Sequence, residues 1–177
     1  MIHTGFANEI LKLATGKVDV LESSGLCYLG FSSTKPNKDG TNFSEPDPTL
    51  YPSYERIQVA VAEALQYTDK WGAVADGQVA NMYEFTSREC LEGDEETGWP
   101  TFYYFGIFKN KSGGVPLISD LLRDPDGVPD PETGLYPEKP LSVTKGKVAV
   151  FRAGALQLTL TVEDKVEVEE TGEETGE

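Results

Sequence analysis

The chain has 177 residues, of which 38% are hydrophobic and 25% are charged, a composition typical of a single folded domain. Its 30 acidic and 15 basic side chains give a formal net charge of −15. Nucleic-acid phosphates and anionic lipid headgroups repel such a charge, so we expect neither nucleic acid nor a membrane among its partners.

The N-terminal segment carries a helical stripe. Phe6, Ile10 and Leu13 recur at the spacing of one helix face. Thr4 is placed to cap the start of this helix and Gly16 to end it. We therefore predict a short helix that packs its apolar face on a sheet.

The rest of the body has the pattern of short strands. The dense apolar run 26–31 predicts a strand buried on both faces, and the aromatic segment 101–109 predicts a central strand. The Gly-containing turn 110–114 predicts a hairpin that joins this strand to 115–122. Alternating or apolar runs predict further strands at 54–59, 82–85, 141–144, 148–151 and 155–162.

These elements predict a mainly β fold: an antiparallel sandwich or partly closed barrel with one short N-terminal helix. Residues 1–162 are expected to form a single β-rich domain, with loops at 32–53, 91–98 and 123–140. Residues 163–177 contain eight acidic groups and one Lys, so we expect a tail that is disordered unless a partner orders it. Such a tail keeps the protein soluble, mimics nucleic acid or binds a basic partner.

The first residues show no signal peptide, and no apolar run approaches the ~20 residues that cross a bilayer. Cys27 and Cys90 stand alone, too few for a zinc site. They are either two thiols or, in an oxidising compartment, a disulfide.

No motif for catalysis appears. His3 is the only histidine, and its place at the chain terminus predicts a mobile side chain that could not serve a catalytic triad. Carboxylate pairs of the kind that hydrolyse glycosides are always conceivable in so acidic a chain. We expect a protein that is not an enzyme and needs no cofactor.

The aromatic residues 102–105 offer two interpretations. Aromatic rings that stack on sugars are one, and alternating core and surface aromatics of a strand are the other.

One loop suggests a metal. Asp124, Asp126 and Asp130 lie around Gly127 in the order D-x-D-G-x-x-D. Alternating oxygen ligands beside a tight turn are what calcium loops use, and the order resembles calcium-binding repeats of the thrombospondin type. The same stretch contains three prolines, so a stiff, solvated connector remains the default interpretation.

Several stretches, in order along the body, resemble a family of small bacteriophage proteins described as tail-fibre-like or minor virion structural proteins. They are the helix 6–13, the strand and loop Tyr28–Pro36 with Asp39-Gly40 and Glu45-Pro46, the Tyr-x-Arg-x-x-Val strand 54–59, the hairpin around Gly106-Ile107-Phe108 with Gly113-Gly114 and Leu117, and the closing segment with Val143, Gly146 and Phe151–Leu160. The segments 91–98, 123–140 and 163–177 depart from the pattern and resemble insertions.

The resemblance implies a non-enzymatic structural component of a virion. It would be made in the host bacterial cytoplasm and placed on the outer surface as a tail-fibre, collar or baseplate piece, or as a capsid decoration or minor capsid protein. Its partners would be other virion proteins and further copies of itself in a homo-oligomer. The alternative is a carbohydrate- or receptor-binding module at a tail tip, with Trp71, Trp99 and exposed tyrosines as binding platforms. Head and tail placement stay equally open.

Overall fold

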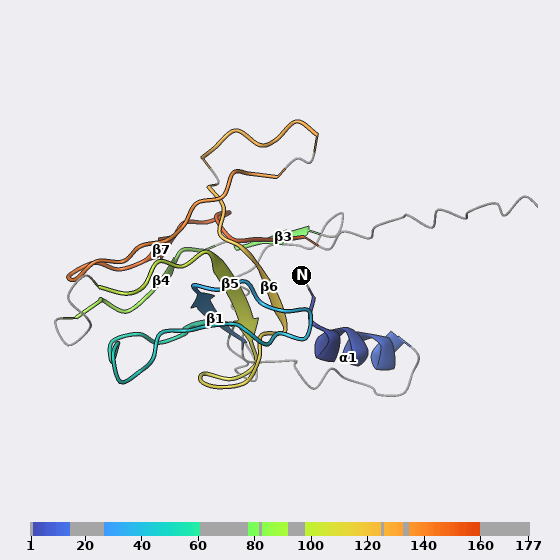
Figure 1. The fold of residues 1–177 in the computed structure, drawn as a ribbon. Coiled ribbons are helices and arrows are strands. Elements are labelled where there is room, and N and C mark those ends of the chain that lie inside the picture. The colour runs from blue at the N-terminus through green and yellow to red at the C-terminus, as the bar shows by residue number, and fades with distance from the viewer. Residues whose placement is uncertain are drawn as a thin grey trace, which may run out of the picture.

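The computed structural model describes residues 2–14, 27–60, 78–81, 83–91, 98–124, 126–132 and 135–159. Its elements, drawn in Figure 1, are α1 (Thr4–Ala14), β1 (Cys27–Ser32), β2 (Ile57–Ala60), β3 (Gln78–Ala80), β4 (Phe85–Thr86), β5 (Tyr104–Phe108), β6 (Ile118–Leu121), β7 (Val150–Phe151) and β8 (Gln157–Thr159).

The largest sheet has four antiparallel strands in the order β2-β1-β5-β6. β1 and β5 are its central pair, with Gly30 opposite Gly106, so the strand predicted at 26–31 and the central strand predicted at 101–109 are both present. The turn after β5 contains Gly113 and Gly114 at positive φ, where glycine avoids the strain of a Cβ, and it returns the chain as β6. The predicted hairpin is therefore also confirmed.

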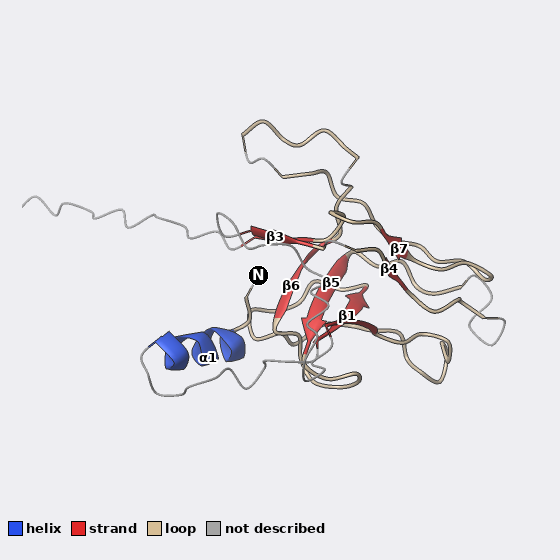
Figure 2. Ribbon diagram, turned by 180° about the vertical axis from the view of Figure 1, so that it is seen from behind, coloured by secondary structure: helices blue, strands red, loops and turns tan. Residues whose placement is uncertain are grey.

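Two short antiparallel pairs, β3–β8 and β4–β7, lie beside this sheet (Figure 2). Phe31 of β1 stacks on Phe151 of β7 with 5.2 Å between ring centroids, which joins the sheet to the second layer. Phe85, Phe102 and Leu156 belong to the same buried cluster. The predicted mainly β, sandwich-like antiparallel fold is confirmed, and the described strands do not close into a barrel.

The predicted helix is present, but its attachment differs from expectation. Thr4 does not cap the helix: its hydroxyl donates to the carbonyl of Lys38, and the helix starts at Thr4 itself. Ile2 forms a bridge with Ile118 of β6, and His3 N–H donates to Leu117 O at 3.0 Å. The residues before α1 thus extend the sheet at β6, and the helix lies beside the sheet in both ribbon views (Figures 1 and 2).

The described residues of 123–140, which we call the arm, form an exposed loop as predicted, and the two sides of this loop hydrogen-bond to each other. The backbones of Arg123 and Glu138 form an isolated antiparallel β-bridge, and Asp130 N–H donates to Leu135 O at 2.9 Å. The Arg123 guanidinium also donates to Tyr136 O at 2.7 Å. Figure 1 shows the arm, in orange, projecting from the top of the body.

Other expectations fall outside the described part of the chain: the tail 163–177, most of the acidic loop 91–98, and Trp71. Within the described part, no helix has the length and apolar character needed to span a membrane.

Candidate interaction site

His3 corrects one expectation. Its side chain is only 1% exposed, with Nε2 2.9 Å from Ser119 Oγ and Nδ1 3.3 Å from Lys38 O. Because a carbonyl only accepts, Nδ1 carries the proton and Nε2 accepts from the serine hydroxyl. Burial lowers the pKa of His3, partly offset by its hydrogen bond to the Lys38 carbonyl.

The terminal position therefore did not make His3 mobile, because sheet pairing of Ile2 holds the segment in place. The histidine and serine are both buried, at 1% and 2% exposure, which suits a structural hydrogen bond better than attack on a substrate.

The three carboxylates proposed as calcium ligands lie in different surroundings. Asp124 Oδ1 accepts from Lys139 Nζ at 2.9 Å, which lowers the pKa of its carboxyl. Asp130 Oδ1 accepts from Glu132 N–H at 2.9 Å, and Asp126 is exposed. Among the described residues, no three His, Cys, Asp or Glu side chains gather closely enough to hold a metal ion. Calcium binding therefore remains a sequence-based prediction without a preformed site.

The aromatic segment alternates as a strand does. Phe102 and Phe105 are buried, whereas Tyr103 is 43% exposed. Trp99, proposed as an exposed platform, is instead 4% exposed and donates through Nε1 to Ser53 Oγ at 3.0 Å. That part of the sugar-binding expectation is wrong because Trp99 packs edge-on against Tyr54 within the core.

No disulfide joins Cys27 and Cys90. Burial raises the pKa of the Cys27 thiol, which makes it a poorer nucleophile at neutral pH.

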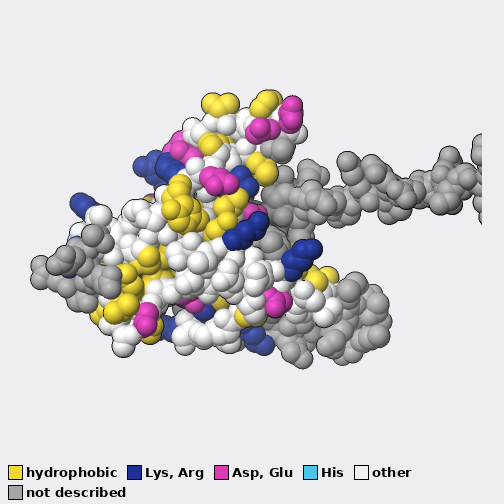
Figure 3. All heavy atoms as spheres, in the orientation of Figure 1, with side chains coloured by type: hydrophobic (Ala, Val, Ile, Leu, Met, Phe, Trp, Pro, Cys, Tyr) yellow, Lys and Arg dark blue, Asp and Glu magenta, His cyan; other side chains and the backbone are white. Residues whose placement is uncertain are grey.

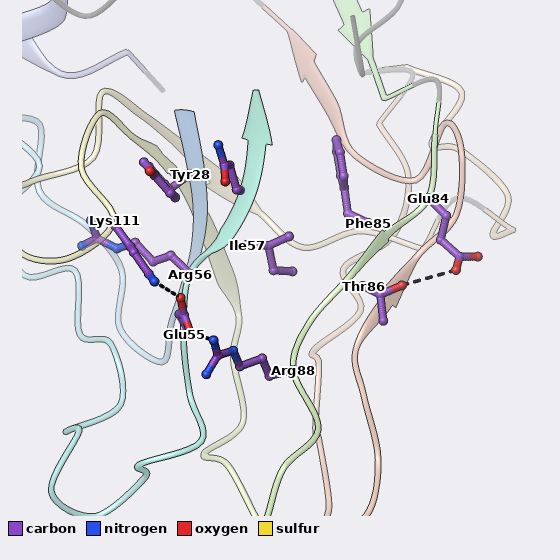
Figure 4. A pocket seen from close by; sticks show the side chains of 10 residues that line it. Tyr28, Glu55, Arg56, Ile57, Glu84, Phe85, Thr86, Arg88 and Lys111 are labelled. Atoms are coloured by element: carbon purple, nitrogen blue, oxygen red, sulfur yellow. Dashed lines mark hydrogen bonds and ion pairs between the residues drawn. The ribbon is translucent and has the colours of Figure 1, made fainter. Parts of the chain in front are cut away.

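The described part of the chain has a cleft between β2 and β4, with a cavity volume of about 350 Å³ (Figure 4). That volume is near the lower end of the ~300–1,000 Å³ of ligand pockets. β2 is an edge strand of the four-stranded sheet, and among the described strands β4 pairs only with β7. The cleft therefore runs between two sheet edges, lined by Tyr28, Glu55, Arg56, Ile57, Gln58, Glu84, Phe85, Thr86, Arg88 and Lys111.

Two cations share one carboxylate at the mouth of this cleft. Arg88 Nη2 lies 2.7 Å from Glu55 Oε2, and Lys111 Nζ pairs with Glu55 Oε1. Figure 4 shows Glu55 between these two side chains. Arg88 and Lys111 are 68% and 62% exposed, so both cations at this mouth are accessible to solvent. Glu84 lies on the β4 side, where its carboxylate accepts from Thr86.

The inner wall of the cleft rests on a buried ion pair. Arg56 Nη2 lies 2.5 Å from Glu45 Oε2, Nε donates to Glu45 Oε1 at 2.8 Å, and the Arg56 side chain is 2% exposed. Arg56 Nη1 donates to the carbonyls of Asn110 and Gly113, so it also holds the β5–β6 turn. Its guanidinium lies 3.4 Å from the centre of the Phe108 ring, a cation–π contact.

Tyr54 binds the same Glu45 carboxylate but does not line the cleft. Its hydroxyl accepts from Phe31 N–H at 2.9 Å and donates to Glu45 Oε1 at 3.1 Å. Burial raises the pKa of Tyr54 well above its ordinary value, and the nearby Glu45 charge adds to the rise. The phenol therefore stays a neutral hydrogen-bonding group rather than an acid or base at neutral pH.

Sequence reasoning singled out the Tyr-x-Arg strand but not the cleft beside it. The residues that line the cleft come from 28, 55–58, 84–86, 88 and 111, so only the pairing of distant strands brings them together. A comparison of the chain with protein-family models and with curated protein sequences finds no match.

Proposed function

We propose that this chain is a non-enzymatic structural protein of a bacteriophage virion, an accessory component of the particle surface. The observation that carries the proposal is that the residues resembling the phage family meet at one structural centre. Gly30, Glu45, Arg56 and Phe108 come from three separate stretches of that resemblance, yet they touch around the buried ion pair.

The contacts explain why those residue types occur together. A Cβ on Gly30 would lie 2.6 Å from Glu45 Oε1 and 2.9 Å from the Phe108 ring. A Cβ on Gly106 would lie 2.7 Å from the Phe43 ring. These positions accept only glycine without rearrangement, so the shared pattern has the character of a scaffold rather than of a reacting site.

The charge favours an external position. A net charge of −15 beside packaged DNA would retain counterions instead of releasing them, which opposes binding inside a capsid. An outer surface carries no such cost, and an edge-rich β unit docks readily through its strands and loops.

Co-sedimentation with purified particles tests the proposal. We expect the protein to travel with intact virions, to be accessible there to antibodies, and to be found by mass spectrometry in separated heads or separated tails. A protein absent from washed particles contradicts the virion role, and one that antibodies reach only after the particles are opened contradicts the external placement.

The alternative, a carbohydrate- or receptor-binding module, has weaker support. Tyr83 and Tyr103 are exposed at 58% and 43%, but the buried Trp99 offers no stacking surface. Binding of the isolated protein to a glycan array, with loss on Tyr103→Ala, would favour this alternative.

A further inference from the structure

The N-terminal segment, residues 2–14, is attached to the body through one buried side chain. Among the described side chains of residues 2–10, only that of His3 is buried, with 1% of its surface exposed. No histidine surface is visible on the face of the molecule drawn in Figure 3. Phe6 and Ile10 of α1 are only partly covered. The attachment of this segment to the sheet therefore depends strongly on His3.

The backbone contacts of the segment lie around the same imidazole. His3 N–H donates to the carbonyl of Leu117, directly before β6, at 3.0 Å. Thr4 N–H donates at 3.2 Å to the Lys38 carbonyl, which also accepts from the ring Nδ1–H. Because β6 and the loop around Lys38 bind both the ring and the backbone, a ring that leaves its site takes these backbone hydrogen bonds with it.

The site suits a neutral imidazole and not a cation. Both hydrogen-bonding partners of the ring are uncharged: the Lys38 carbonyl at Nδ1 and the Ser119 hydroxyl at Nε2. Protonation puts a hydrogen on Nε2, so the Ser119 hydroxyl must turn from donor to acceptor. A buried charge without a charged partner is costly, so protonation favours a state in which the ring is in water.

The surrounding charges do not reverse this preference. Burial has the largest influence on the pKa of His3 and lowers it, the positive amino terminus lowers it further, and the exposed Asp39 carboxylate raises it. Lys38 meets the ring through its carbonyl and has an exposed side chain. On β6, the Asp120 carboxylate accepts from Leu121 N–H, and strand alternation directs it away from the face of its neighbour Ser119. The first turn of α1 contains no acidic residue.

We propose that His3 is a pH-operated latch: the neutral imidazole holds residues 2–14 on β6, and its protonation releases this segment while the body stays folded. Release frees the Leu117 carbonyl and the outer edge of β6, which the segment covers in the neutral form. A sheet edge without a partner can pair with a further strand. The inference goes beyond the proposed virion role and does not rest on it.

Hydrogen exchange of the full-length chain, followed by mass spectrometry at pH 7.5 and 5.5, tests the latch against His3→Gln. Glutamine offers a donor and an acceptor but does not titrate, and comparison at one pH cancels the pH dependence of the exchange chemistry. At pH 5.5 we expect amides of residues 4–14 to exchange at least about fivefold faster in the wild type than in the variant. At pH 7.5 the two rates should be similar, and β1 and β5 should stay protected throughout.

The proton itself can be followed by NMR, because His3 is the only histidine of the chain and its ring signals need no separation from others. Asp39→Asn keeps an acceptor for Thr41 and removes the charge that favours the protonated ring, so the midpoint of titration should move to lower pH. The matched control is Asp47→Asn, which changes an exposed aspartate that binds Thr49 in the same way. It should leave the midpoint unchanged.

Three results would overturn the inference. The first is a wild-type segment whose protection does not depend on pH, or depends on it equally in His3→Gln. The second is loss of protection in residues 4–14 together with β1 and β5, which would mean acid unfolding of the whole body. The third is a midpoint that moves equally in the two aspartate variants, since the imidazole would then not titrate beside Asp39.

Discussion

Arg56 places a positive charge inside the body, where only a complete set of partners makes it tolerable. It is bound to Glu45, to two backbone carbonyls and to the face of Phe108. A buried ion pair adds little net stability, but removing one partner leaves the other charged and desolvated. We expect Arg56→Met to lower the free energy of unfolding by about 3–5 kcal/mol in urea titrations.

The control is Arg88→Met, which breaks an exposed pair with Glu55. Exposed pairs contribute about 0–1 kcal/mol, so this variant should unfold close to the wild-type midpoint. Equal losses of unfolding free energy in the two variants would mean that burial does not determine how much Arg56 contributes to stability.

Gly30 is constrained by close approach rather than by backbone angle. A Cβ there would press on Glu45 Oε1 and on the Phe108 ring, both held by Arg56. We expect Gly30→Ala to cost about 1–3 kcal/mol, as overpacking of a core does. Gly5→Ala, in α1 where nothing lies within 4 Å of the new Cβ, should instead stabilise by about 0.5–1 kcal/mol. Chemical denaturation of both variants compares the two effects.

His3 should make stability depend on pH just below neutrality. Burial lowers its pKa in the folded state below the ordinary value of 6.5, so the unfolded chain binds the proton more readily. Stability is therefore fully present above about pH 6.5, falls as the pH drops through that value, and levels off below the folded pKa.

Urea unfolding of wild type and His3→Gln at pH 7.5, 6.5 and 5.5 checks this. The wild type should lose more stability than the variant across that range. Hydrogen bonds from Thr41 and Thr49 lower the pKa of Asp39 and Asp47 below their ordinary value of 3.8, so these groups titrate outside the range tested. Parallel pH profiles would show that protonation of His3 is not linked to unfolding.

At the scale of elements, the strands differ greatly in how they are held. β1 and β5 are each hydrogen-bonded on both sides, and Leu29, Phe31, Phe105 and Phe108 are buried along them. The β4–β7 pair has only two residues in each strand. We therefore expect the β4–β7 pair to open at a lower free energy than β1 and β5.

Amide hydrogen exchange measures this difference directly. The slowest amides should be those of β1 and β5, which open only on global unfolding, whereas those of β4 and β7 should exchange through smaller local openings. Uniform protection across both layers would contradict the prediction.

For the whole molecule, the surplus of acidic residues lies mainly outside the described side chains. Basic and acidic side chains are nearly equal in number among the described residues, while 163–177 alone carries eight acidic groups. Self-repulsion of a net charge of −15 still opposes compaction, and salt screens it. Raising NaCl from about 0.02 M to about 0.2 M should raise Tm by roughly 2–5 °C in scanning calorimetry. A Tm that falls would show that attractive ion pairs outweigh the repulsion.

Much of the local structure could be predicted because its causes are local. The dense apolar run at β1, the aromatic run at β5, the glycines between β5 and β6, and the stripe of α1 each predicted the element that is present. The Pro- and Asp-rich composition of the arm likewise predicted an exposed segment. These patterns reflect side-chain periodicity and backbone preference, which neighbouring residues determine.

Only the tertiary structure decided which side chains contact one another. His3 is buried because Ile2 pairs with Ile118, Trp99 is buried against Tyr54, and Glu55 meets both Arg88 and Lys111. The sequence by itself determined that the chain is acidic, β-rich and built from short strands, because composition and periodicity act within a few residues. Which charges and rings meet depends on pairing between strands far apart in the chain, and that pairing minimises the free energy of the whole fold rather than of any segment.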